Sequence, residues 1–332
     1  MSRSRLLALG LVALAAGCGT QSGLHLENGG RTVAVASRPK PPAPGSHPTR
    51  QPRRVTARVA LGGVPTLAWD GSSMWAAVWA DGPGVLGSLV SVDAVTGRAQ
   101  RPLPLPPSAR PYLLAASADG LFVATDRRVL RIDPAGGRVI ASLALPGHPK
   151  TILLARGSLW VTVAGGPLLQ VDPVHLGIAN SFSVMAEPDS VTIVPGAIYV
   201  TDDRDRAVVR LDPRSGRLAS AVSIGATGAA RPSIVTVYGD SIWVYEGSSV
   251  VRLARRSQRL LDRISLSDGR GAMAAGTGGV WVTGSFGVAR IDPATGELGR
   301  PIALPSGGAA LATTGDAVWV ADGHGTLLRI SP

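Results

Sequence analysis

The chain has 332 residues, with 33 basic and 22 acidic side chains and one cysteine, so an internal disulfide is excluded. Its 42 glycines and 26 prolines indicate many turns, and the body of the chain has no strong helical periodicity, so we expect an all-β fold. Residues 1–54 hold eight basic side chains and one acidic one, which leaves 25 and 21 for the remainder. This small excess, with no basic stripe among aromatics, argues against nucleic acid as a partner.

The chain begins with the pattern of a bacterial export signal. Two arginines precede an apolar run over residues 6–16, which is too short to span a bilayer. The stretch Leu14-Ala15-Ala16-Gly17-Cys18 resembles a lipoprotein lipobox, and the resemblance implies that the cysteine is diacylated and becomes the new N-terminus. We therefore predict a signal peptide over 1–17 and attachment to the outer face of the cell membrane through lipidated Cys18. An ordinary secretory signal is the alternative.

Residues 18–54 have the composition of a tether. They are rich in proline and arginine, as in the run Pro39-Lys40-Pro41-Pro42-Ala43-Pro44. Such a segment cannot bury a core, so we expect it to be disordered and partly extended. Its arginines favour an anionic membrane surface, whereas a simple spacer is the alternative.

From residue 55 onward the chain repeats a bulky aromatic flanked by apolar residues, as in Val280-Trp281-Val282. The copies are 38 to 47 residues apart, and their aromatics are Trp75, Phe122, Trp160, Tyr199, Trp243, Trp281 and Trp319. A period near 40, with about four short strands per copy, is typical of a β-propeller. We therefore expect one domain over 55–332 with seven blades, in which the aromatics form the core.

A turn motif follows the aromatic in most copies. It reads apolar-Arg-apolar-Asp-Pro-x-x-Gly, and in the second copy it runs from Leu130 to Gly137. Asp can bond to the following backbone N–H groups, Pro presets φ and Gly takes a positive φ, so the motif predicts a tight hairpin. The third copy, from Asp172 to Gly177, is interpreted as one residue longer, and the fifth copy has lost the motif.

The two ends of the repeated region complement each other. The last copy ends at Ser331-Pro332 and therefore has no fourth strand. Residues 55–61 resemble the fourth strands of other copies, such as 139–145. We expect this N-terminal strand to close the last blade, because closure removes an exposed sheet edge.

Function is expected where the copies differ. In a propeller, the fourth-to-first and second-to-third connections share one face, on which ligands usually meet the ring. The fourth-to-first connections carry Arg110, His148, Glu187, Asp189 and Arg231. The longest connection, in blade 1, is a further place where function concentrates. From these loops we take as candidate binding residues Trp79, Asp81, His148, Asp202, Asp203, Asp205, Arg231, Tyr245, Glu246 and His324.

The densest charge cluster is Asp202-Asp203-Arg204-Asp205-Arg206. Its carboxylates offer oxygen ligands for Ca²⁺, whereas the reading that we favour is a solvated turn neutralised by its arginines. We predict neither a metal nor a cofactor. His148 and His324 belong to blades 3 and 7, too far apart around the ring to share an ion or a catalytic step. The sequence contains no Gly-x-Ser-x-Gly, His-Glu-x-x-His or P-loop motif.

The whole repeat unit, from the aromatic to the Asp-Pro turn, resembles that of virginiamycin B (streptogramin) lyases and related YVTN-type or quinoprotein-like propellers. The resemblance covers about residues 55–332 and implies the fold. For the lyases it also implies a magnesium-assisted site with two histidines and a glutamate on late blades. Residues 226–304 contain no histidine, so no catalytic residue is carried over.

These observations favour a monomeric, non-enzymatic binding module of the cell envelope. Its partner is expected to be a protein, a peptide or a glycan met on the loop-bearing face. One alternative is a lyase- or hydrolase-type propeller enzyme that uses Asp, Glu and Arg. Another is a structural or sensory component of an envelope complex.

Overall fold

The structure, a computed structural model, describes residues 54–63, 66–78, 87–107, 109–184, 186–224, 231–267, 271–276 and 278–331. The predicted signal peptide, Cys18, the predicted tether up to residue 53 and the candidates Trp79 and Asp81 lie outside these residues. No helix among the described residues is long and apolar enough to cross a membrane.

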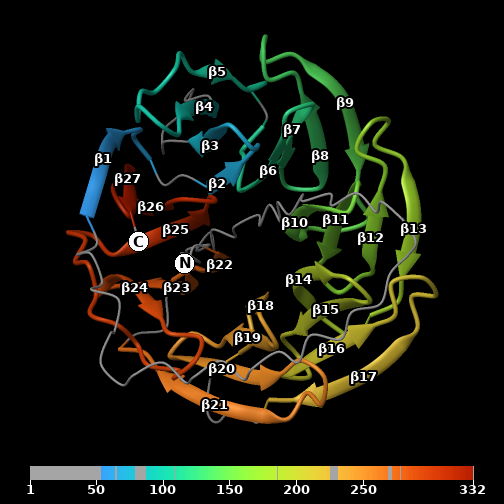
Figure 1. Cartoon of the computed structure of the whole chain (residues 1–332). Helices are drawn as coiled ribbons and strands as arrows, with labels where there is room; N and C mark the ends of the chain where they lie inside the picture. Colours follow the sequence, from blue (N-terminus) through green and yellow to red (C-terminus); the bar gives the residue numbers. More distant parts are fainter. Residues whose placement is uncertain are drawn as a thin grey trace, which may run out of the picture.

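Seven antiparallel sheets surround a central axis, so the predicted seven-bladed propeller is confirmed (Figure 1). Strands follow one another outward from the axis in sequence order within blades 1 to 6. The strands of blades 1 to 3 are β2 (Thr66–Trp69), β3 (Ser73–Val78), β4 (Ser88–Asp93), β5 (Leu103–Pro104); β6 (Leu113–Ser117), β7 (Gly120–Ala124), β8 (Arg128–Ile132), β9 (Val139–Ala144); β10 (Pro149–Ala155), β11 (Ser158–Val163), β12 (Leu168–Val171) and β13 (Ile178–Phe182). Those of blades 4 to 6 are β14 (Pro188–Val194), β15 (Ala197–Asp202), β16 (Ala207–Leu211), β17 (Leu218–Ser223); β18 (Ile234–Tyr238), β19 (Ser241–Tyr245), β20 (Ser249–Ala254), β21 (Leu260–Ser265); β22 (Met273–Gly276), β23 (Gly279–Gly284) and β24 (Gly287–Ile291).

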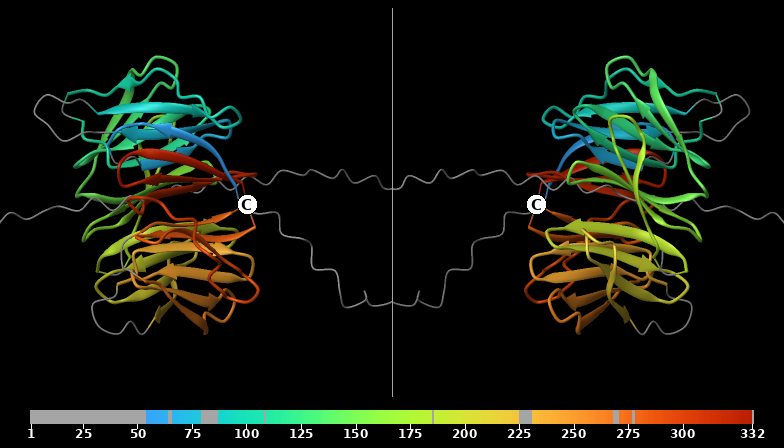
Figure 2. Two further views of the ribbon diagram at one scale, coloured as in Figure 1. Left: turned by 90° about the vertical axis from the view of Figure 1, so that its left-hand side faces the viewer. Right: turned by 90° about the vertical axis from the view of Figure 1, so that its right-hand side faces the viewer.

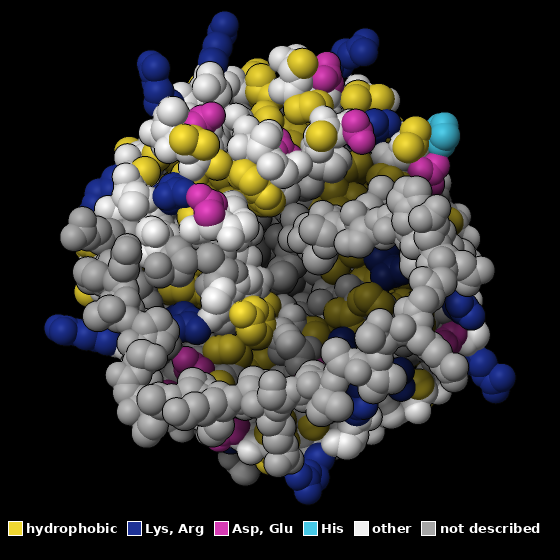
Figure 3. All heavy atoms as spheres, viewed as in Figure 1, with side chains coloured by type: hydrophobic (Ala, Val, Ile, Leu, Met, Phe, Trp, Pro, Cys, Tyr) yellow, Lys and Arg dark blue, Asp and Glu magenta, His cyan; other side chains and the backbone are white. Residues whose placement is uncertain are grey.

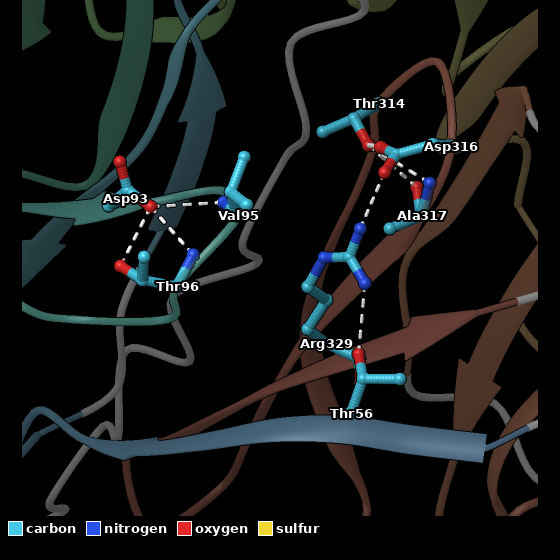
Figure 4. A network of polar contacts seen from close by, with 8 residues as sticks. All are labelled: Thr56, Asp93, Val95, Thr96, Thr314, Asp316, Ala317 and Arg329. Carbon is cyan, nitrogen blue, oxygen red and sulfur yellow. Dashed lines mark hydrogen bonds and ion pairs between the residues drawn. The ribbon is translucent and has the colours of Figure 1, made fainter.

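Blade 7 joins the two ends of the domain. It contains β25 (Gly308–Thr313), β26 (Val318–Asp322), β27 (Thr326–Ser331) and, outermost, the N-terminal β1 (Arg54–Ala60). The predicted closing strand is therefore confirmed. Arg329 on β27 also donates hydrogen bonds to Thr56 on β1 (3.0 Å) and to Asp316 in the turn between β25 and β26 (2.5 Å), so a polar network reinforces the closure (Figure 4).

The ring has two different faces. The turn face carries the first-to-second and third-to-fourth turns, such as 118–119 and 133–138, together with the C-terminus, and it faces the viewer in Figure 1. The loop face, on the far side, carries the second-to-third and fourth-to-first connections, such as 125–127 and 203–206. Figure 2 shows the disc edge-on, with the C-terminus on one side.

The repeated aromatics are core residues, as predicted. All seven lie on second strands, and the most exposed of them, Trp75, has only 6% of its surface in water. Trp281 packs with Leu311 and Val320 of the next blade in a buried apolar layer. Burial of such large side chains between blades, at about 25 cal/mol per Å² of apolar surface, is what holds neighbouring blades together.

The Asp-Pro motif forms the predicted hairpin. Asp212 Oδ1 accepts hydrogen bonds from the backbone N–H of Arg214 (3.0 Å) and Ser215 (2.8 Å), and Gly216 has a φ of 68°. Our interpretation of the third copy as one residue longer is wrong. Leu176 N–H bonds to Asp172 O and Leu176 takes the left-handed conformation (φ 54°) that glycine holds elsewhere. Its side chain is buried in the core, which offsets the cost of that conformation.

The arginine of the motif also belongs to the scaffold. It lies on the third strand and reaches the first-to-second turn of its own blade. Arg131 donates to Asp119 O (3.1 Å), Arg290 to Gly278 O (2.7 Å) and Arg252 to Ser241 Oγ (2.9 Å). The arginine therefore recurs in blades 2, 4, 5, 6 and 7 because it binds the first-to-second turn, whereas blades 1 and 3 have Ser91 and Gln170 at this position.

Two outer strands are shorter than the motif alone suggests. In blade 6 the predicted fourth strand, 300–304, is reduced to isolated bridges, of which one pairs Ile302 with Val288. In blade 1 it is only Leu103–Pro104. Prolines at 102, 104 and 301 supply no N–H to the ladder, so only fragments of an outer strand form there.

Candidate functional site

The predicted meeting of the two sets of connections on the loop face is confirmed by backbone hydrogen bonds. Asp203 N–H donates to Glu187 O (3.0 Å), and Ala164 N–H donates to His148 O (2.8 Å). Each bond joins a second-to-third loop to the entry of the first strand of the same blade. The candidates on these loops therefore surround the mouth of the ring.

A proline marks the entry to the innermost strand in blades 2 to 5, at Pro111, Pro149, Pro188 and Pro232. In blades 3 and 4 a β-bulge follows it, at Lys150 and at Asp189-Ser190, and blade 7 has the same irregularity at Ala309. Bulges re-aim side chains and are frequent beside functional sites. Blades 3 and 4 place a charge at this position, whereas blade 7 places a methyl group there.

Asp189 is held firmly from both sides. Its backbone carbonyl accepts hydrogen bonds from the hydroxyls of Thr151 and Thr162, both at 2.7 Å and both from blade 3. The neighbouring Ser190 Oγ accepts the backbone N–H of Val235 from blade 5 (3.3 Å). The bulge is thus tied to two other blades, which makes its position precise for any ligand that it contacts.

The carboxyl group of Asp189 has an unusual titration. Burial raises its pKa, the Lys150 ammonium opposes this shift, and the Asp203 and Glu187 carboxylates add to it, so that the pKa lies at about 7. Burial raises a carboxyl pKa because the charged form loses hydration. At neutral pH this group is therefore divided between its acid and its carboxylate form.

Charges of both signs lie next to Asp189. Arg231, at the entry to blade 5, has its Nη1 3.3 Å from Asp203 Oδ1 of blade 4, and the two side chains are 53% and 29% exposed. Lys150 is exposed one blade away. The loop face thus offers an ammonium, a guanidinium and carboxyl groups across blades 3 to 5.

A second polar group joins blades 2 and 3. His148 Nδ1 lies 2.8 Å from Asp126 Oδ1, and both side chains are mostly in water. The Tyr112 hydroxyl donates to Asp126 O (3.3 Å), and burial, with a smaller effect of the Asp126 charge, raises the pKa of this tyrosine. His324 is exposed on the same face in blade 7, and the structure does not bring it to His148.

Asp202 is turned into the protein rather than toward solvent. Its side chain is buried and accepts the backbone N–H groups of Glu187 and Asp205, each at 2.8 Å. Asp322 does the same in blade 7, where it accepts the N–H groups of His324 (3.0 Å) and Thr326 (2.8 Å). Within the described residues no three His, Cys, Asp or Glu side chains converge in a way that could hold a metal ion.

Tyr245 and Glu246 are also buried. Tyr245 ends strand β19 and packs in the layer between blades 5 and 6. Glu246 binds the guanidinium of Arg263 through Oε2, which also accepts from Ser249 (3.0 Å). Arg263 in turn donates to Ile224 O of blade 4 (2.5 Å). Through these bonds Arg263 links Glu246 of blade 5 to blade 4 and stabilises the boundary between the two blades beside the site.

The sequence prediction included Asp189 among the connections but missed Lys150 and Arg263. One signal could have singled out Lys150. A proline precedes the inner strands of blades 2 to 5, and the residue type after it changes from blade to blade. No local sequence pattern indicates the role of Arg263, because its partners Glu246 and Ile224 lie 17 and 39 residues away in the chain.

No protein-family model matches the chain, and no curated protein matches it. Among solved structures it is similar to virginiamycin B lyase from Staphylococcus aureus, with a TM-score of 0.68 and 18% identity over 84% of this chain and 99% of that one. It is also similar to BamB from Moraxella catarrhalis, with a TM-score of 0.61 and 13% identity over 84% and 98%. At these identities the likeness shows a shared propeller fold and no more.

Proposed function

We propose that the protein is a binding module whose ligand, a protein, peptide or glycan of the cell envelope, meets the loop face beside blades 3 to 5. The observation that carries the proposal is the pair of bulges that place Lys150 and Asp189 on neighbouring blades. The bulge itself does not require a charged side chain, since blade 7 has alanine at the equivalent bulge.

The surrounding groups support a polar ligand. Lys150 and Arg231 are exposed donors, and Asp203 and Asp189 supply acceptors. The backbone of Asp189 is fixed by hydrogen bonds from blade 3, so little ordering of this residue is required when a ligand binds. A rigid scaffold that presents variable loops is a frequent arrangement for recognition.

Peptide and glycan arrays test this proposal. The wild-type chain is compared with Lys150→Ala combined with Asp189→Asn. A matched control is Asp172→Asn combined with His175→Ala, which alters a carboxylate and its imidazole partner on the turn face. We expect the first variant to bind at least about tenfold more weakly, because charge-assisted hydrogen bonds are lost. The control should bind as well as the wild type. Equal binding by all three proteins would contradict the proposal.

A second candidate function, an enzyme of the lyase or hydrolase type, is favoured by one observation. The pKa of Asp189, raised to about 7, suits a general acid or base at neutral pH. The test is turnover of lactone and ester substrates as a function of pH. An enzyme would show an inflection near pH 7 that Asp189→Asn removes, and a chain without turnover would leave binding as the function.

For the cell location we propose export and lipid anchoring through Cys18, on the strength of the lipobox pattern. Radioactive palmitate should label the wild type in a bacterial host and leave Cys18→Ala unlabelled. Equal labelling of both proteins would overturn the assignment of this cysteine.

A further inference from the structure

Exposed aliphatic side chains gather at the rim of the turn face. In the part of the chain that the structure describes, every exposed large apolar side chain lies in a third-to-fourth turn or in the first two residues after it; these are Val95, Ile140, Val174, Ile178, Leu218, Leu260 and Leu261. None of these seven is aromatic.

On blades 4 and 5 these leucines lie among arginines. Leu218 and Leu260, 58% and 51% exposed, directly follow Arg217 and Arg259 in the chain. Arg214 and Arg256, in the same two turns, are exposed as well. We call Arg214, Arg217, Leu218, Arg256, Arg259 and Leu260 the arginine–leucine patch. Figure 3 views the turn face and shows Lys and Arg side chains projecting around its rim.

The two halves of the patch are joined across the blade boundary. Ser220 Oγ on β17 of blade 4 donates to Gln258 Oε1 in the turn of blade 5 (2.6 Å). Gln258 immediately precedes Arg259, and Ser220 lies two residues after Leu218. The patch is therefore one continuous surface rather than two separate turns.

The carboxylates of the same region neutralise it only in part. Asp212 interacts with the Arg214 charge and with the N–H groups of its own turn, and Asp240 lies 3.3 Å from Arg255, which is outside the patch. Asp262 accepts the backbone N–H of Arg263 (2.7 Å). Among the described residues no carboxylate forms an ion pair with Arg217, Arg256 or Arg259.

The chain enters the ring on this face. Arg54, the first residue of β1, is paired with Ser331 of β27 beside the C-terminus, on the turn face (Figure 2). The 53 residues that precede it, with their excess of basic side chains, are thus attached to the face that carries the patch.

We propose that the arginine–leucine patch docks on the surface of an anionic lipid bilayer. Arginines next to exposed aliphatic side chains suit a surface that offers both phosphate charges and an apolar layer beneath them. A nucleic acid would be matched by aromatic side chains on which bases stack, and the exposed apolar side chains here are all aliphatic. In this orientation the rim of the turn face at blades 4 and 5 is the part nearest the membrane.

This docking requires neither lipidation of Cys18 nor a ligand on the loop face. It is tested with the full chain carrying Cys18→Ser, so that no acyl chain contributes, in sedimentation with vesicles of phosphatidylglycerol and phosphatidylcholine in equal parts. Binding should occur, should weaken as NaCl is raised, and should be absent with phosphatidylcholine alone. Absence of binding to the anionic vesicles, or equal binding to both kinds, overturns the proposal.

Two double variants make the test specific. Arg217→Glu with Arg259→Glu should weaken binding by at least about tenfold, since each basic residue near an anionic surface contributes about fivefold. The matched control is Arg98→Glu with Arg138→Glu, which changes the same turn position on blades 1 and 2, across the ring (Figure 1). It should stay within about twofold, because those turns belong to blades outside the patch and screening by salt weakens the attraction of charges that are not close to the bilayer. Equal losses for the two variants would show diffuse attraction and refute a defined patch.

A third variant tests the aliphatic part. Leu218→Asn with Leu260→Asn keeps the charge and should weaken binding severalfold at any salt concentration. Binding identical to that of the parent chain contradicts insertion of the leucines. Thermal unfolding of each variant, expected within a few degrees of the parent because all six positions are exposed, shows that the fold is retained.

Discussion

The two faces of the ring shift the pKa of aspartate side chains in opposite directions. On the turn face, hydrogen bonds from the turn, first among them the Thr96 N–H, hold the pKa of Asp93 below its usual range (Figure 4). The Ser215 N–H has the same effect on the pKa of Asp212. On the loop face, burial raises the pKa of Asp189. The first two carboxylates are exposed and bonded by their own hairpins, whereas Asp189 lies at the junction of three blades.

This difference separates scaffold from site. A carboxylate that its own turn stabilises recurs in every blade that makes the same turn. A carboxyl that is desolvated and surrounded by other blades depends on one place in the ring. The repeat therefore explains the turn face, and the exceptions to the repeat define the loop face as the place for recognition.

The largest effect is expected at the seam between the two ends. Removing β1 leaves β27 with an unpaired edge and uncovers part of the apolar layer around Val59 and Leu327. We expect the shortened chain to lose cooperative thermal unfolding, as followed by circular dichroism. A shortened chain that melts like the full one would show that blade 7 is stable with three strands.

A smaller but still large effect is expected below the loop face. Arg263→Met leaves the buried Glu246 carboxylate without its charged partner and should lower the free energy of unfolding by about 3 kcal/mol. Adding Glu246→Gln to that variant should restore part of the loss, measured by chemical denaturation. If the double variant is less stable than Arg263→Met alone, the cost does not come from an unpaired charge.

Asp189→Asn tests the loop-face carboxyl by the pH dependence of stability. Its pKa is raised in the folded state, so the folded protein binds the proton more tightly and wild-type stability falls as pH rises from about 4 to about 7. The variant lacks this loss, so relative to the wild type it should gain of the order of 2 kcal/mol across that range, after a discount for water near the side chain. Parallel pH profiles for the two proteins would exclude a raised pKa.

Asp212→Asn is the matched test on the turn face and should show the opposite sign. Its pKa is lowered in the folded state, so it contributes stability that is present above the unfolded pKa near 4 and is lost at lower pH. The wild type should therefore exceed the variant in stability at neutral pH, and the difference should shrink in acid. Chemical denaturation at several pH values measures it, and a difference that grows in acid would reverse the assignment.

The position of several candidates shows how far sequence reasoning reached. His148, Asp203 and Arg231 lie on the loop face as predicted, because their place follows from which connection carries them. Asp202, Tyr245 and Glu246 were expected there too, yet they are buried as a loop cap, a core residue and an ion-pair partner. The direction of each side chain depends on the residue at which the strand ends, and the repeat pattern alone does not specify that residue.

By itself, the sequence determined the number of blades, the core aromatics, the Asp-Pro hairpins and the closing N-terminal strand. All of these arise from contacts within one repeat or from the need to cover one edge, so they leave a periodic trace. The tertiary structure alone decided that Lys150 and Asp203 lie near Asp189, that Arg231 pairs with Asp203, that Arg263 joins Glu246 to Ile224 of blade 4, and that the arginine–leucine patch is continuous. These contacts join residues far apart in the sequence, most of them from different blades, and no period records which side chains face each other.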